Sequence, residues 1–246
     1  MRHLPWLIAL LAVIATAHAE PPRPAKPYTP VPIVRPKAFD DVSFVAFRNE
    51  LAAAAKARVY AGLATLVRKR DFFWGRDFGQ RFDPRKPAVD NLAVAVELEH
   101  ADGTGWGKLA AFASEPAIDP LDSRPGVVCA PARPNYDGVA YAKLLDETYT
   151  NAEEWAYPRA DATPVRDAPS PTAATIGMLA PAFVWLLATD GAHEPGNLPW
   201  LHVGLPDGKS GFVAPGSLRA LTAEQLCYDK DPIDGWRITG YVGRGN

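Results

Sequence analysis

The sequence has few of the residues from which common catalytic frameworks are built. It contains five histidines and two cysteines in 246 residues. No H-E-x-x-H segment, glycine-rich phosphate loop or G-x-S-x-G elbow occurs, so the usual signatures of zinc hydrolases, nucleotide enzymes and α/β-hydrolases are missing. Cys129 precedes His193 and His202 as in a cysteine peptidase, but without a recognisable local motif. We therefore predict no catalytic residue, no metal site and no cofactor.

A surplus of basic residues is also absent, since 26 lysines and arginines stand against 28 aspartates and glutamates. A formal net charge of −2 gives no electrostatic footprint for DNA or RNA, so nucleic acid is excluded as the main partner. Beyond its first residues the chain has no apolar run near the ~18 residues of a spanning helix, and no membrane span is predicted.

One apolar run does lie at the start of the chain, where Arg2 is followed by Leu4–Ile14 and then by Ala17-His18-Ala19. A positive start, a short apolar stretch and an A-x-A site are the parts of a secretory signal peptide. We expect residues 1–19 to be removed and the protein to be periplasmic or secreted.

Cys129 and Cys227 are the two cysteines, and both remain after signal removal. Export places them in an oxidising compartment, where an even number of cysteines favours disulfide formation. We predict an intramolecular disulfide that closes a loop of 227 − 129 = 98 residues. Two buried free thiols and an intermolecular bridge are the alternatives.

Proline is concentrated near the expected mature N-terminus, where seven of the sixteen residues 21–36 are proline. Proline fixes φ and removes a backbone donor, so residues 20–38 are predicted to form an extended, polyproline-II-like arm. A simple tether is the favoured interpretation. Its PxxP spacings also suit an aromatic groove, and docking on the protein's own β domain is a further alternative.

Helical periodicity dominates residues 39–150. Phe44, Phe47 and Leu51 recur at steps of three and four residues after a candidate N-cap at Asp40 or Asp41. We expect two helices, or one helix with a break at Gly62, over roughly 41–69, and the remaining elements follow along the chain. These are helices over 89–99 and 106–113, and a helix or strand over 139–145.

From Trp155 the pattern becomes β. Short apolar runs separated by turn residues predict five strands, at 162–165, 175–179, 183–187, 200–205 and 211–213. Asp207-Gly208 between the last two is a strong hairpin signal. Five short strands in about 60 residues indicate a small barrel over 155–221.

Four motifs in this region occur in a familiar order. They are the start T-P-V-R-D-A-P-S from Thr163, I-G-M-L from Ile176, W-L-H-V from Trp200 and D-G-K-S-G-F-V from Asp207. Together they resemble a bacterial SH3 (SH3b) domain, from which the loop Asp190–Pro199 departs by its length. The resemblance implies an SH3-like barrel that binds peptidoglycan or peptide segments.

A further strand follows the barrel, over Asp234–Val242. Trp236, Ile238 and Val242 share its apolar face. A five-strand barrel does not need this strand, so we place residues 222–246 back on the N-terminal domain. The predicted fold class is therefore α+β: a mainly helical α+β domain, a small SH3-like barrel and a returning C-terminal strand.

The functional prediction is an exported, non-enzymatic binding protein whose partner is a cell-wall peptide or a protein segment. Aromatic rings give contact area at low entropic cost, so the candidate ligand-binding residues are Trp200, Phe212, Tyr157 and Trp185. Trp200 is the best candidate for an exposed platform, and Trp185 fits a core position better. The alternative is a cell-wall hydrolase with its catalytic unit in 39–150, for which Glu97/Glu99 would be one possible carboxylate pair.

Overall fold

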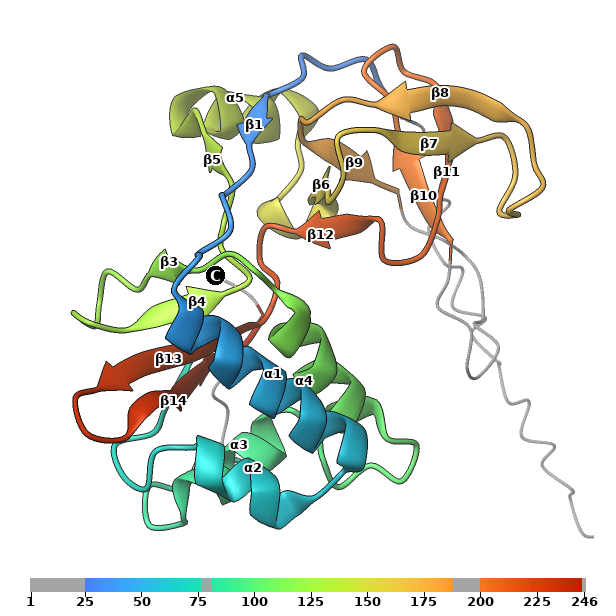
Figure 1. Ribbon diagram of the computed structural model, residues 1–246. Helices are drawn as coiled ribbons and strands as arrows, with labels where there is room; N and C mark the ends of the chain where they lie inside the picture. The colour runs from blue at the N-terminus through green and yellow to red at the C-terminus, as the bar shows by residue number, and fades with distance from the viewer. Residues whose placement is uncertain (1–24, 77–80, 188–199, 245–246) are drawn as a thin grey trace, which may run out of the picture.

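A computed structural model describes residues 25–76, 81–187 and 200–244 (Figure 1). The predicted signal peptide and the loop Asp190–Pro199 lie outside these described residues. The helices are α1 (Val42–Ala57), α2 (Tyr60–Leu66), α3 (Ala88–Ala95), α4 (Thr104–Ser114), α5 (Gly138–Thr148) and the 3-10 helix η2 (Ala152–Glu154).

The strands fall into three sheets. One pairs β1 (Ile33–Val34) with β5 (Asn135–Tyr136). The five-stranded sheet has the order β2 (Phe73–Gly75), β14 (Gly235–Val242), β13 (Gln225–Asp231), β4 (Val128–Ala130) and β3 (Asp119–Pro120). The seven-stranded sheet has the order β12 (Leu218–Ala220), β6 (Trp155–Pro158), β9 (Val184–Leu186), β10 (Leu201–Gly204), β11 (Ser210–Val213), β7 (Thr163–Arg166) and β8 (Thr175–Leu179).

These elements form two units that lie one above the other in Figure 1. We call residues 37–134 with 222–244 the helical unit, which combines α1 to α4 with the five-stranded sheet. Residues 25–36 with 135–221 are the strand unit, which combines the arm, α5 and the seven-stranded sheet. The mixed α+β class is confirmed, but among the described residues the seven-stranded order is open and no closed barrel is found.

In the helical unit, α1 packs its buried face on the sheet. The Asp41 side chain caps the helix by accepting from the Phe44 backbone nitrogen at 2.9 Å. Phe44 then meets Tyr228 of β13 edge-on, with ring centroids 5.3 Å apart. Of the two alternatives for 41–69, two helices is correct and one helix with a break at Gly62 is wrong. α1 ends at Ala57, the left-handed φ of 54° at the C-cap Arg58 lets its N–H close on the last turn, and Gly62 lies inside α2.

The remaining helices agree with the predictions in place and differ at their ends. α3 stops at Ala95 instead of 99, because the next residues leave helical geometry and Glu97 has a φ of 63°. α4 begins two residues before the predicted start. The 139–145 segment is helical, with Asp137 accepting from two backbone nitrogens of the first turn of α5.

The five-stranded sheet joins distant parts of the chain. β14 runs parallel to β2 with Gly240 opposite Phe73, where an added Cβ would lie 2.3 Å from the Phe73 ring. β13, which the sequence patterns did not indicate, pairs with both β14 and β4. Across the β13–β4 pair Cys129 faces Cys227 with Cα atoms 4.0 Å apart, and the predicted disulfide is present.

In the strand unit, β10 and β11 pair across Asp207-Gly208 as the hairpin signal predicted. The five predicted strands are all present, as β7 to β11. Their number is too low, because β6 and β12 add two more that pair with each other. Every residue of β6 is buried, so it lacks the alternation by which half-exposed strands are found.

The proline-rich arm is part of the core of the strand unit. Tyr28, Val31 and Ile33 are buried, and the Tyr28 hydroxyl donates to the Gly204 carbonyl at 3.1 Å. The Phe183 backbone nitrogen donates to the Val31 carbonyl at 3.0 Å. Over residues 25–34 the interpretation as a tether is therefore wrong, and the arm docks on its own β unit.

Candidate functional site

A cleft of about 600 Å³ lies between the two units. One wall is the face of α4 that carries Lys108, Phe112 and Glu115, and the opposite wall is β12 with residues 222–224. Glu115 is the C-cap of α4 and lies two turns after Lys108, so the two residues are about 10 Å apart along the helix axis. The cleft therefore has a charged group near each end of this wall.

Between the charged groups the lining is largely apolar. Phe112 of α4, Pro131, Leu186 of β9 and Leu218 of β12 provide this surface. Phe112 belongs to the core of the helical unit and Leu218 to that of the strand unit, so both walls are fixed by packing. A ligand here would contact apolar side chains along its length and charged groups at its ends.

We call Glu115, Arg159 and Arg219 the arginine end of the cleft. Oε1 of Glu115 accepts from Nη2 of Arg159 at 2.9 Å and also from Nη2 of Arg219. Glu115 is 7% exposed, and it comes from the helical unit, whereas both arginines come from the strand unit. Two guanidinium groups thus share one carboxylate oxygen, which leaves the arginine end with a formal charge of +1.

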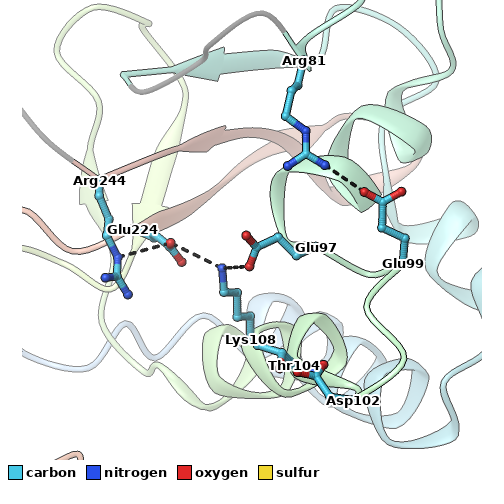
Figure 2. Close-up of polar contacts among 8 residues, drawn as sticks. All are labelled: Arg81, Glu97, Glu99, Asp102, Thr104, Lys108, Glu224 and Arg244. Carbon is cyan, nitrogen blue, oxygen red and sulfur yellow. Dashed lines mark hydrogen bonds and ion pairs between the residues drawn. The ribbon is translucent and has the colours of Figure 1, made fainter. Parts of the chain in front are cut away.

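The second end, which we call the lysine end, is the charge network in Figure 2. Nζ of Lys108 donates to Oε2 of Glu97 at 2.9 Å and lies 3.5 Å from Oε1 of Glu224. Nε of Arg244 lies 3.4 Å from the same Glu224 oxygen. The hydrogen bond from Lys108 lowers the pKa of Glu97 below its ordinary value. The two positive and two negative side chains of the lysine end give it a formal charge of zero.

The backbone around Glu97 is shaped to support this network. An added Cβ at Gly105 would lie 2.6 Å from the Glu97 carbonyl oxygen, so α4 can approach this loop only with glycine there. Asp102 accepts from the Thr104 backbone nitrogen at 2.9 Å at the start of α4, and Arg81 pairs with Glu99 on the outer side (Figure 2). Glu97 and Glu99 therefore pair with different cations and do not form a joint carboxylate site.

The four predicted ligand-binding aromatics do not line the cleft. Trp185 and Tyr157 are 2% and 4% exposed and pack in the core of the strand unit, where no ring face is open to a ligand. Trp200 and Phe212 are half-buried. Phe212 stacks on His202 across the β10–β11 pair, with ring centroids 4.7 Å apart.

Sequence reasoning missed the residues of the cleft itself. Glu115 and Arg219 are 104 residues apart, and Lys108 and Glu224 are 116 apart. Each is a single charged residue with no motif around it. The one local signal is that Lys108 and Glu115 lie seven residues apart within and just after a predicted helix, and this spacing does not indicate what either residue meets.

Among the described residues there is no group of three or more histidine, cysteine, aspartate or glutamate side chains that could hold a metal ion. In the same part of the chain, no helix combines the length and the apolar character needed to cross a bilayer. Comparisons with known protein families, with curated proteins and with solved structures found no match to this chain.

Proposed function

We propose that this is an exported, non-enzymatic binding protein that holds a short cell-wall peptide in the cleft between its units. The observation that carries the proposal is the arginine end: two guanidinium groups face one carboxylate oxygen at one end of a cleft that is lined by both charged and apolar side chains. Guanidinium groups form the strongest and most directional contacts to carboxylates. A ligand carboxylate is therefore the group that this end favours.

The size of the cleft indicates the size of the ligand. The α4 wall is about 10 Å long between Lys108 and Glu115, which is about three extended residues at roughly 3.4 Å each. Apolar lining between the ends suits small aliphatic side chains. At the lysine end, Glu97 and Glu224 offer carboxylates to a ligand amine, in competition with Lys108 and Arg244.

The proposal keeps the strand unit as an SH3b-type domain, on the ordered motifs from Thr163 to Val213. Such domains are expected to bind peptidoglycan or peptide segments, and the strand unit contributes Arg159 and Arg219 to the cleft. Location in the periplasm or outside the cell is supported by the disulfide, because such bonds persist in oxidising compartments.

A wall hydrolase with its catalytic unit in 39–150 is the competing function. Hydrolysis of a glycosidic bond needs a general acid that holds its proton near neutral pH. The lowered pKa of Glu97 favours its ionised form, which suits binding better than acid catalysis. Release of soluble wall fragments by the mature protein, lost in Glu97→Gln, would support the hydrolase instead.

The test of the proposal is a calorimetric titration of the mature protein with a wall stem tripeptide that has a free terminal carboxylate, and with its amidated form. We expect the amidated peptide to bind at least tenfold more weakly. Arg159→Ala should raise the Kd of the free-carboxylate peptide roughly tenfold, because a hydrogen bond to a charged group is worth about 1.5–3 kcal/mol.

The matched control is Arg133→Ala. Arg133 is a comparably half-exposed arginine that pairs with one carboxylate, Asp119, and does not line the cleft. Its variant should bind the peptide as the unaltered protein does. Equal affinities of the two variants, or no binding of either peptide, would contradict the proposal.

A further inference from the structure

The two large sheets have four edge strands, and three of them carry features that prevent pairing with another chain. β2 has three residues, β3 has two and includes Pro120, and β12 has three with Arg219 at its centre. Short length, proline and charge are the usual protections of an exposed edge. β8 is the exception.

β8 is a five-residue edge strand of sequence Thr-Ile-Gly-Met-Leu, without charge or proline. It pairs with β7 on one side, and no strand of the described residues pairs with it on the other. Ile176 and Met178 are 48% and 55% exposed. An unprotected strand of this kind offers free backbone groups to an added strand.

A pocket of about 350 Å³ adjoins this edge. Its lining is almost entirely apolar and includes Ile176 and Met178 of β8, the core residues Val165 and Phe183, and Tyr28 of the arm. None of its lining residues belongs to the cleft between the units. Strand addition gains affinity from the backbone and specificity from pockets that accept alternate side chains, and both features are present here.

The arm shows which kind of segment this part of the strand unit accepts. It crosses the unit in an extended conformation and is held by main-chain hydrogen bonds, from Phe183 to the Val31 carbonyl and from Ile33 to the Pro181 carbonyl. It also buries alternate side chains, Val31 and Ile33. The pocket continues this interface from Tyr28 and Pro30 of the arm to β8.

We infer that β8 and the adjoining pocket form a second binding site, which takes an extended segment of a partner protein by strand addition. The segment pairs its backbone with β8 and inserts one large apolar side chain among Ile176, Met178 and Phe183. This site goes beyond the proposed binding of a wall peptide, because its residues and its mode of recognition are different.

The test uses the mature protein and fluorescein-labelled seven-residue peptides in which threonine alternates with phenylalanine, with valine or with lysine. We expect the phenylalanine and valine peptides to bind at least tenfold more tightly than the lysine peptide. Hydrogen exchange should then slow at the amides of 175–179. Alternate residues of a strand direct their N–H groups to opposite edges, so N-methylation of the odd residues blocks one edge and N-methylation of the even residues blocks the other. One of these two methylated peptides should lose at least tenfold in affinity, while the other should bind as the unmethylated peptide does.

Met178→Asp should lower the affinity for the phenylalanine peptide at least tenfold. Ile233→Asp serves as its control and should leave this affinity unchanged. Ile233 is an exposed apolar residue in the turn between β13 and β14, far from the pocket lining. Equal effects of the two variants would overturn the inference, as would equal binding of all three peptides or of both methylated forms. Dimerisation of the unliganded protein that Met178→Asp abolishes would assign the edge to a second copy of this chain instead.

Discussion

The helical unit and the strand unit are both completed by a segment from far along the chain, but by different means. The helical unit is closed by the C-terminal hairpin β13–β14, which the Cys129–Cys227 disulfide fixes covalently to β4. The strand unit is closed by the N-terminal arm, which is held by packing and hydrogen bonds alone. Because each unit needs a distant segment, neither is a continuous stretch of sequence.

The cores of the two units also differ in the kinds of side chain that they contain. The core of the helical unit is a large mixed set of aliphatic and aromatic side chains. Around the arm, the strand unit packs mostly rings, including the stacked Trp155 and Trp185. The second core of the strand unit, between its strands, is aliphatic, so the rings gather where the arm docks and supplies Tyr28. Aromatic content in such a unit therefore indicates core before it indicates a ligand platform.

Removal of the disulfide should have the largest effect on stability. A cross-link over a 98-residue loop contributes roughly 4–5 kcal/mol in the chain-entropy treatment. The double variant Cys129→Ser and Cys227→Ser should lower the free energy of unfolding in urea by up to this amount. A loss below about 1 kcal/mol, or free thiols in the denatured, non-reduced protein, would contradict the claim that the helical unit, unlike the strand unit, is closed by a covalent bond that stabilises it.

Tyr28→Ala comes next, because it removes the arm's buried ring and its hydrogen bond to Gly204. Truncation of a buried aromatic residue costs about 3 kcal/mol or more in unfolding free energy. Val34→Ala is the control, since Val34 is an exposed residue of the same arm and should change stability by less than about 0.5 kcal/mol. Similar losses for both variants would mean that the arm is not anchored at Tyr28.

Glu115→Gln tests the contact between the units. It removes the charge that two arginines share, and we expect a loss of roughly 2 kcal/mol in unfolding free energy. Glu99→Gln removes a carboxylate from an exposed pair with Arg81 and should cost less than about 1 kcal/mol. If Glu99→Gln is the more damaging variant, the arginine end does not join the units.

The smallest effect should appear at His202, whose pKa is lowered by burial. As pH falls through the ordinary histidine value of 6.5, the unfolded chain takes up a proton before the folded chain does. The free energy of unfolding therefore falls with pH in this range, and His202→Gln should remove that component. Urea unfolding at pH 7.5 and pH 5.5 measures it, and the same pH dependence in His202→Gln as in the unaltered protein would contradict this assignment.

Local patterns predicted much of the helical unit and little of what completes either unit. Periodicity located α1, α3 and α4, and the cysteine count predicted the disulfide partners. The helix break at Arg58 was missed because a left-handed non-glycine residue has no sequence signal comparable to glycine. Docking of the arm was predicted only as an alternative to a tether, because proline content sets its conformation and says nothing of what it packs against.

The cleft could not be predicted from the sequence for a related reason. Its charged residues are scattered along the chain. Those of the lysine end meet when the C-terminal segment returns to the helical unit, and those of the arginine end meet only when the two units pack together. The aromatic candidates were identifiable as residue types, but burial assigned Trp185 and Tyr157 to the core. Residue type predicts chemistry here, and only packing decides which side chains are available for it.

The most direct test of the central claim is a hydrogen-exchange map of the mature protein with and without the free-carboxylate wall tripeptide. A ligand between the units should slow exchange in both walls at once, at α4 (Thr104–Ser114) and at β12 (Leu218–Ala220). At a peptide concentration near the Kd of the unaltered protein, Arg159→Ala should reduce both changes together. Protection confined to the outer β10–β11 surface around Trp200 and Phe212, or no protection at saturating peptide, would contradict a binding site between the units.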